Sequence, residues 1–186
     1  MAMCDQSSIY CSPRIDIDIG LFTINTLVIK YKKSHVGVFS LKTEDMDQSI
    51  DSSKAPKAVG AYPHARKVGQ LLFLSGVGPR TAGSGPHDSG VPGLELDHNG
   101  NFKSFDFEAQ VHSVFANVKA ILESAGSDWE KLVDITVFLV DMKRDFHTFN
   151  RIYADYFPNN KPCRTTVAIN SLPTPIAIEL KCIAEL

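Results

Sequence analysis

The chain has 186 residues, which suits one well-cored domain with an appendage and is short for two full domains. Its 19 basic and 21 acidic residues give a formal net charge of −2, which makes nucleic acid and anionic lipid poor first guesses as partners. No apolar run approaches the roughly 20 residues of a membrane-spanning helix, so we expect a soluble protein with no membrane contact.

The N-terminal residues 1–51 differ in composition from the rest and are interpreted as an extension with a linker. Residues 15–19 alternate apolar and acidic side chains as a strand does, whereas residues 42–57 are rich in Asp, Ser, Lys and Glu and have little to bury. The acidic residues of the extension argue against a secretory signal or a transit peptide. We expect a boundary near Ser52 and one domain over residues 52–186.

The cysteines and histidines suggest neither a disulfide framework nor a metal site. Cys4, Cys11, Cys163 and Cys182 are scattered, and the histidines lack metal-ligand spacing. We expect free thiols in a reducing, cytoplasmic compartment. Cys163 and Cys182 are interpreted as small strand residues and not as nucleophiles.

The first elements of the domain are predicted to be a hairpin, a long loop and a helix. Residues 71–75 are apolar and predict a buried strand that pairs with a short preceding strand. Residues 78–101 contain six glycines and three prolines and predict a surface loop. Apolar side chains at helical spacing over residues 107–122 predict a helix, with Asp106 as its N-cap and Gly126 just past its end.

A central strand and a second helix are predicted next. The β-branched and aromatic run over residues 132–140 has strand length. The following aromatic residues fall on one side of a helix that we expect to be capped by Asp145 and to stop at Pro158. This helix is expected to pack beside the first.

Two final strands over residues 163–170 and 176–184 are predicted to close the domain as a hairpin. The intervening residues 171–175 contain two prolines, which favour a turn. The predicted order is β-β-α-β-α-β-β, an α+β architecture in which two helices cover one face of a sheet.

The last two strands each carry one charged side chain among apolar neighbours. Arg164 and Glu179 would be costly to bury without partners, and a structural ion pair is one interpretation. A five-residue turn pairs Asn170 with Ile176 and sets Glu179 opposite Val167, offset from Arg164 by roughly 10 Å along the strands. That offset leaves room for a small acid and a water, so a functional interpretation stays open.

Seven short motifs follow one another from the start of the domain to its end. They are G-A-Y-P-H-A at 60–65, F-L-S-G at 73–76, N-V-K-A-I-L-E-S-A-G at 117–126, T-V-F-L-V-D-M at 136–142, N-R-I-Y-A-D-Y-F at 150–157, P-C-R-T-T-V at 162–167 and I-E-L-K-C-I-A at 178–184. This ordered set resembles the Rid/YjgF family of imine and enamine deaminases, and it is far more specific than any single motif.

The resemblance implies a chorismate-mutase-like fold, a homotrimer with active sites between subunits, and hydrolysis of an enamine or imine carboxylic acid to a carbonyl compound and ammonia. It implies no metal and no organic cofactor. Arg164 would bind the substrate carboxylate, and Glu179 would position or activate a water. The other cleft residues that it implies are Tyr62, Ser75, Gly76, Asn150 and Thr166. An ordinary packing or hydrogen-bonding role is the alternative for Tyr62, Ser75 and Asn150.

Within the family, the chain most resembles the 2-aminomuconate deaminase branch. It departs from many members at Ala61, Val77 and Thr166, and it carries an additional Arg80 after the Ser-Gly step. Arg80 is expected to bind a second carboxylate if it points into the cleft, and to be a solvated loop residue otherwise. His64 lies close enough in sequence to reach the same cleft.

Three functions remain as alternatives to a 2-aminomuconate deaminase. The first is a general 2-iminoacid or enamine deaminase, and the second is a non-catalytic trimer that binds small acids or proteins. The third, ribonuclease activity, is disfavoured because the chain is nearly neutral and has no basic, aromatic-rich stripe.

Overall fold

The contacts of the chain divide it into two units, Met1–Glu44 and Asp45–Leu186. The computed structural model describes residues 19–22, 26–30, 36–39, 48–84, 90–99 and 102–186. In the first unit, β1 (Ile19–Phe22), β2 (Thr26–Lys30) and β3 (Val36–Phe39) form an antiparallel sheet in that order. The strand alternation expected over residues 15–19 lies, apart from Ile19, outside the described residues.

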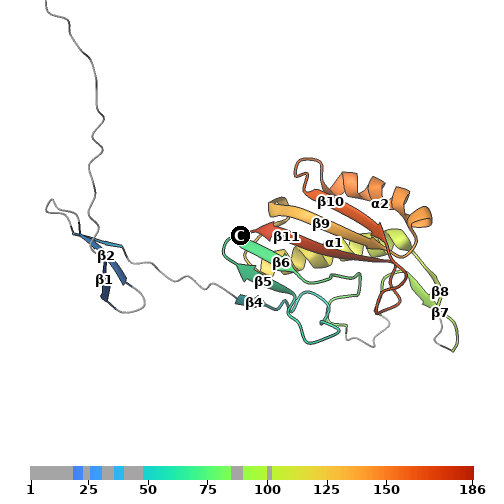
Figure 1. Ribbon diagram of the computed structural model, residues 1–186. Helices are drawn as coiled ribbons and strands as arrows, with labels where there is room; N and C mark the ends of the chain where they lie inside the picture. Colours follow the sequence, from blue (N-terminus) through green and yellow to red (C-terminus); the bar gives the residue numbers. More distant parts are fainter. Residues whose placement is uncertain (1–18, 23–25, 31–35, 40–47, 85–89, 100–101) are drawn as a thin grey trace, which may run out of the picture. The chain divides into compact units, whose positions relative to one another are not determined.

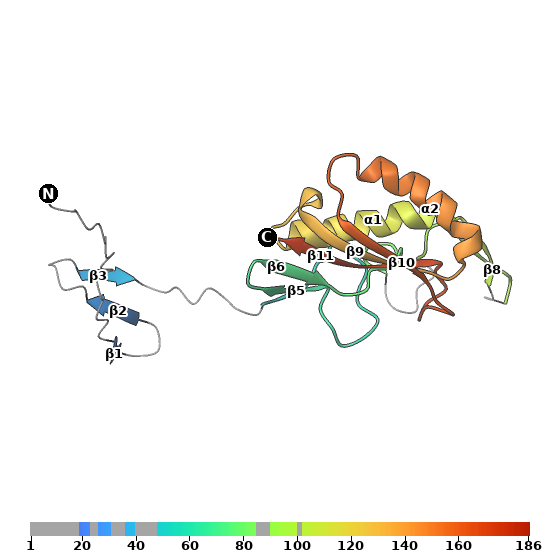
Figure 2. The same ribbon diagram turned by 45° about the horizontal axis from the view of Figure 1, so that its top comes forward.

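The second unit is built on a six-stranded mixed sheet (Figure 1). The order across the sheet is β10-β9-β11-β6-β5-β4, and the bounds are β4 Gln48–Ile50, β5 Ala65–Val68, β6 Leu71–Leu74, β9 Leu132–Leu139, β10 Cys163–Ala168 and β11 Ile178–Glu185. Helices α1 (Phe107–Ser124) and α2 (Met142–Tyr156) lie on one face of this sheet (Figure 2). The α+β class is confirmed, with both predicted helices on one face.

The hydrophobic core lies between the helices and the face of the sheet that they cover. Alternate residues of β9, namely Ile135, Val137 and Leu139, are buried there, whereas Thr136 and Phe138 project from the other face. The apolar stripe of α1 packs onto this layer together with Phe149 and Ile152 of α2. No helix among the described residues is both long and apolar enough to cross a membrane.

An aspartate side chain caps the start of each helix, but only one of the two caps is the predicted residue. Asp106 caps α1 as expected and accepts a hydrogen bond from the Ala109 N–H at 3.1 Å. The prediction of Asp145 as the second N-cap is wrong, because the carboxylate of Asp141 accepts from the Arg144 N–H at 3.0 Å and α2 begins one residue later. Asp145 lies instead inside the first turn of α2, where it is buried.

The predicted closing hairpin is also wrong. Strand β10 pairs in parallel with β9, and β11 pairs with β9 from the other side, so β9 separates the last two strands. The connection through α2 makes β9-α2-β10 a β-α-β unit, and packing of α2 on the sheet stabilises this arrangement over a local turn. Glu179 and Val167 are level, as expected, but both lie opposite Phe138 of the intervening strand.

Two segments expected to be irregular contain strands. Within the predicted loop, β7 (Leu94–Leu96) pairs with β8 (Phe102–Phe105), which follows the loop. Within the predicted linker, β4 extends the main sheet before the expected boundary, and Ser52 and Ala55 are buried. The Ser52 hydroxyl lies 2.8 Å from that of Ser124 at the end of α1. A short 3-10 turn, Trp129–Lys131, leads into β9.

Candidate functional site

A cavity of about 170 Å³ lies where β6 ends and β11 begins. Its walls come from the segment before β5, the residues that follow β6, and the turn before β11. The predicted site residues that line it are Tyr62, Ser75, Gly76, Arg80 and Glu179. Five positions spread over more than 100 residues of sequence therefore meet at one small cavity.

Glu179 supplies the carboxylate of this cavity. It pairs with Phe138 and so projects from the face of the sheet that the helices leave uncovered. Burial raises the pKa of Glu179, and within the described residues no hydrogen bond or charge opposes this effect. A Cβ added to Gly76 would lie 2.5 Å from Oε1 of Glu179, so only glycine leaves the carboxylate in its place.

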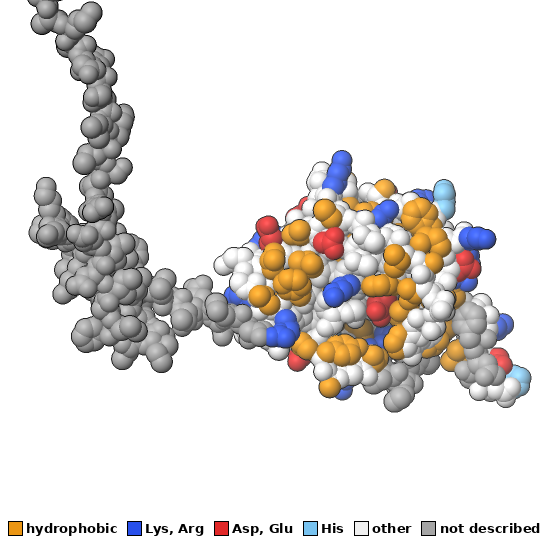
Figure 3. Space-filling view, in the orientation of Figure 1, with side chains coloured by type: hydrophobic (Ala, Val, Ile, Leu, Met, Phe, Trp, Pro, Cys, Tyr) orange, Lys and Arg blue, Asp and Glu red, His pale blue; other side chains and the backbone are white. Residues whose placement is uncertain are grey.

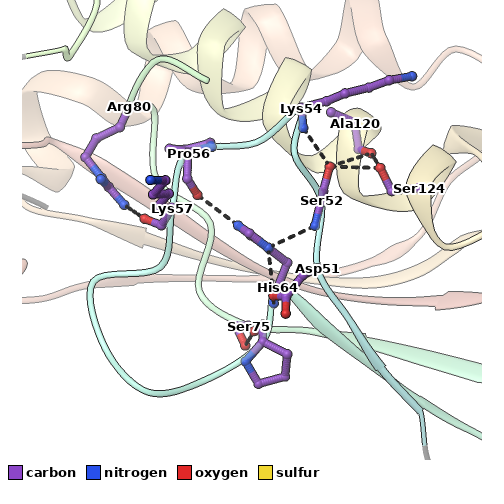
Figure 4. Close-up of polar contacts among 11 residues, drawn as sticks. Asp51, Ser52, Lys54, Pro56, Lys57, His64, Ser75, Arg80, Ala120 and Ser124 are labelled. Atoms are coloured by element: carbon purple, nitrogen blue, oxygen red, sulfur yellow. Dashed lines mark hydrogen bonds and ion pairs between the residues drawn. The ribbon is translucent and has the colours of Figure 1, made fainter. Parts of the chain in front are cut away.

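Ser75 and His64 fix the wall beside this carboxylate (Figure 4). The Ser75 hydroxyl donates to the carbonyl of Pro63 at 2.6 Å. Nδ1 of His64 lies 3.1 Å from the Ser52 N–H and 3.2 Å from the Asp51 carboxylate, and Nε2 lies 2.8 Å from the carbonyl oxygen of Pro56. Both ring nitrogens of His64 are thus engaged by neighbouring groups, and the residue shapes the cavity.

Arg80 lines the cavity and is not the solvated loop residue that was one of its two expected roles. It is only 7% exposed, which excludes a solvated loop residue. Its guanidinium donates to the carbonyl of Lys57, as Figure 4 shows, and to that of Ser84 at 3.4 Å. These bonds hold the segment before β5 against the segment after β6.

A row of polar side chains on the buried side of α1, which we did not single out in the sequence, anchors the cavity walls. Gln110 accepts from the Ala177 N–H at 2.8 Å, and the Ser113 hydroxyl donates to the carbonyl of Pro79 at 2.7 Å. Asn117 donates to the carbonyls of Gly78 and Arg80 at 2.9 and 2.7 Å. Polar residues at helical spacing within an apolar stripe are the signal that could have identified them.

The remaining predicted site residues form a second group on β10 and α2. Arg164 pairs with the buried Ile135, so it projects from the helix-covered face, opposite to that of Glu179. The two residues are also two strands apart, roughly 10 Å, and offset by roughly 10 Å along the strands. The arrangement that a hairpin register would allow, with a small acid between Arg164 and Glu179 of the same chain, is therefore not what the structure has.

Arg164 lies over aromatic rings and has no acidic partner among the described residues. Its guanidinium carbon is 4.5 Å from the ring centroid of Tyr153 and 5.6 Å from that of Phe149. Thr166 shares this face of β10, and its hydroxyl is buried without a hydrogen-bond partner among the described residues. Asn150 follows Phe149 on α2 and is half-buried.

The two described cysteines differ in their surroundings. Cys182 is fully buried in β11, and burial raises the pKa of its thiol to about 12, so it is a core residue and not a nucleophile. Cys163 is exposed on β10, so the interpretation as a packed small residue holds only for Cys182.

The fold and the cavity define an α+β domain with one desolvated carboxylate at a small internal site. A sequence model of the family described as endoribonuclease L-PSP matches residues 52–186, and the chain belongs to this family, also called Rid/YjgF. Among its relatives, Reactive Intermediate Deaminase A, chloroplastic, of Arabidopsis thaliana is 34% identical over 168 residues, which are 90% of this chain and 79% of the relative.

Further relatives match three quarters of the chain. A RutC family protein of Pyrococcus horikoshii is 35% identical over 142 residues, which are 75% of this chain and 98% of the relative. The crystal structure of E. coli TdcF with bound serine superposes with a TM-score of 0.59 at 27% identity, covering 75% of this chain and 98% of TdcF. Both proteins are matched over almost their entire length.

Proposed function

We propose that the protein is a hydrolytic deaminase of small 2-imino or 2-enamino acids. The observation that carries this proposal is the Glu179 carboxylate, which faces a cavity of about 170 Å³ without a competing partner among the described residues and whose pKa burial raises. A carboxylate with a raised pKa is a stronger base than an ordinary glutamate, as activation of water requires. The Arabidopsis relative named as a reactive intermediate deaminase supports the same reaction class.

The proposed reaction needs only water and the side chains of the protein. An enamine first tautomerises to its imine. Glu179 accepts a proton from water as the oxygen bonds to the imine carbon, while the electron pair of the C=N bond moves to nitrogen, which takes up a proton. The carbinolamine then collapses: Glu179 returns its proton to the nitrogen, the O–H proton passes to water as the carbonyl forms, and the C–N bond breaks with its electron pair on nitrogen to release ammonia.

A homotrimer would bring Arg164 to this cavity from a neighbouring subunit. Within one chain Arg164 projects from the wrong face of the sheet. The uncovered face carries exposed apolar residues, which Figure 3 shows gathered over the strands; they include Val68, Leu71, Phe73 and Val167. Such a face is typical of an interface between copies of a chain. We propose that this contact forms the trimer and brings the edge strand β10 of one subunit to the cavity of the next, where Arg164 binds the substrate carboxylate with Asn150 and Thr166 beside it.

A narrower specificity for 2-aminomuconate depends on Arg80. The residue lines the cavity, which favours a role toward the second carboxylate of a dicarboxylic enamine, but its guanidinium already donates to two carbonyls. We therefore place 2-aminomuconate within the substrate range and general imine hydrolysis first. Preference for 2-aminomuconate that disappears in Arg80→Lys would support the narrower function, and equal rates with both substrates would remove it.

Ammonia release from a freshly generated 2-iminoacid, with the uncatalysed rate subtracted, tests the proposal. Glu179→Gln is expected to lose about 100-fold in kcat, within the range of general acid–base groups. Glu185→Gln, an exposed residue of the same strand, is the matched control and is expected to keep wild-type rates. No release above background by the folded wild type would overturn the deaminase function and favour a binding protein, and RNA cleavage that survives repurification would favour a nuclease.

A further inference from the structure

Arg164 is held by an aromatic face in place of a carboxylate. Within the described part of the chain it forms no hydrogen bond or salt bridge, although it is half-buried on β10. Its guanidinium carbon lies 4.5 Å from the ring centroid of Tyr153, within the range of a cation–π contact. Burial raises the pKa of Tyr153, so the phenol stays protonated and the contact is not an ion pair.

An aromatic partner leaves the N–H donors of the Arg164 guanidinium available to a ligand. A guanidinium has five N–H donors in its plane, and stacking occupies the face of the plane but none of the donors. A buried Asp or Glu at the same place would take two of these donors and neutralise the charge. An aromatic partner therefore orients the cation while leaving it able to bind the carboxylate of a ligand bidentately.

Tyr153 is itself fixed by neighbouring rings. The ring centroid of Phe157 lies 4.3 Å away and that of Phe149 lies 5.5 Å away. The Tyr153 hydroxyl is buried and has no hydrogen-bond partner among the described residues. The hydroxyl thus contributes nothing visible to the fold, and the position of the ring is set by packing.

We propose that Tyr153 is the positioning residue of the carboxylate-binding half-site: its ring, not its hydroxyl, fixes the guanidinium of Arg164 in the orientation that receives the substrate carboxylate. The inference rests on the proposed deaminase function for its kinetic consequences. It predicts that loss of the ring weakens binding of the acid and leaves the chemistry at Glu179 intact.

Steady-state deamination of a 2-iminoacid by Tyr153→Leu, Tyr153→Phe and Tyr156→Leu tests this role. Tyr153→Leu is expected to raise KM about tenfold, with kcat changed less than twofold, as expected for loss of a cation–π contact. Tyr153→Phe keeps the ring and is expected to retain the wild-type KM. Tyr156→Leu makes the same change at another ring of α2, which contacts Phe115 and Trp129, so it is expected to lower the melting temperature similarly without raising KM.

A double variant and a binding measurement complete the test. In an Arg164→Ala background, Tyr153→Leu is expected to have no further effect on KM, because Tyr153 acts through Arg164. Calorimetric binding of 2-oxobutanoate, a product-like acid, gives a readout that needs no turnover, and its Kd is expected to follow the same pattern.

The outcomes separate this inference from the proposed function. Wild-type binding of 2-oxobutanoate without ammonia release would overturn the deaminase function alone, and the variants would still test Tyr153 by their Kd values. Unchanged Kd in a folded Tyr153→Leu, or an equal loss in Tyr156→Leu, would overturn the positioning role. No binding and no turnover by the wild type would overturn the half-site itself.

Discussion

At the scale of single residues, the cavity depends on the contact between Gly76 and Glu179. Oε1 of Glu179 lies 2.5 Å and its Cδ lies 2.9 Å from where a Cβ of residue 76 would be. Gly76→Ala is therefore expected to push the carboxylate aside and to lower kcat/KM about 100-fold, as loss of a catalytic base does. Because the end of a glutamate side chain can move, we expect little loss of melting temperature.

Gly78→Ala is a suitable control for this substitution. A Cβ at residue 78 would crowd only Cδ1 of Ile176, at 2.9 Å, and would not touch the carboxylate. We expect at most a few-fold change in ammonia release. Equal losses in the two variants would show that crowding of the cavity, and not displacement of Glu179, causes the effect.

The raised pKa of Glu179 has consequences for stability that can be measured as a function of pH. The folded protein holds the Glu179 proton more tightly than the unfolded chain, whose pKa is near the ordinary value of 4.5. The contribution of Glu179 to the free energy of unfolding therefore decreases as the pH rises from its pKa in the unfolded chain through its higher pKa in the folded protein. Urea unfolding across this window should show a decline that Glu179→Gln lacks.

The same shift sets the acid limb of the pH–rate profile. If the carboxylate form is the base, kcat/KM should rise with a midpoint above 4.5. A profile that is flat across this region, or an unchanged stability difference between wild type and Glu179→Gln, would argue against a titrating Glu179.

At the scale of the elements, the start of α2 is joined to the β7–β8 hairpin by a charged contact. The Arg144 guanidinium forms two hydrogen bonds of 2.7 Å with the Asp145 carboxylate and lies 4.5 Å from the ring centroid of Phe105. The exposed fraction is 50% for the Arg144 side chain and 2% for that of Asp145. Removal of Arg144 therefore leaves a buried charge without its partner, whereas removal of Asp145 leaves a charge that is half-exposed to water.

This asymmetry predicts unequal effects of the two alanine variants. Arg144→Ala leaves a buried carboxylate unpaired and is expected to cost about 3 kcal/mol of unfolding free energy. Asp145→Ala leaves an arginine that water can solvate and is expected to cost about 1 kcal/mol. Chemical denaturation of both variants checks the order, and an equal or reversed order would contradict it.

The sequence was sufficient for elements whose signals are local. The spacing of apolar residues predicted both helices and the central strand, and Asp106 was identified as a cap. Two acidic residues precede the aromatic run of α2, so local pattern alone did not separate Asp141 from Asp145. The position of β10 in the sheet depends on its long-range pairing with β9, and local sequence patterns do not predict such a pairing.

The candidate site was predictable in composition but not in arrangement. Charged residues within apolar strands identified Arg164 and Glu179, and the family motifs supplied the remaining lining residues. The strand order then placed these two on opposite faces, a fact that periodicity within each strand cannot give. Tyr153 and Asn117 were not predicted as functional residues, because their spacing in the sequence matches that of ordinary residues on a buried helix face.

At the scale of the whole molecule, the second unit contains the proposed site. The family match begins at residue 52, whereas β4 begins at Gln48 and pairs with β5. The carboxylate of Asp51, just before the match, accepts from the His64 N–H at 3.4 Å, and Ser52, at its first residue, contacts His64 and Ser124. The functional boundary should therefore lie nearer to residue 45 than to Ser52.

Two truncations separate these boundaries. The fragment 45–186 is expected to fold with the melting temperature and kcat/KM of the full chain, because it keeps β4 and every described contact of the second unit. The fragment 55–186 loses β4 and the Ser52 contacts, so it should melt several degrees lower and show a raised KM through the freed His64. Ser52→Ala keeps the main-chain bond to His64 and should lose only the hydroxyl contacts. An inactive or unfolded 45–186 fragment would instead show that the first unit contributes to the stability or the site of the second.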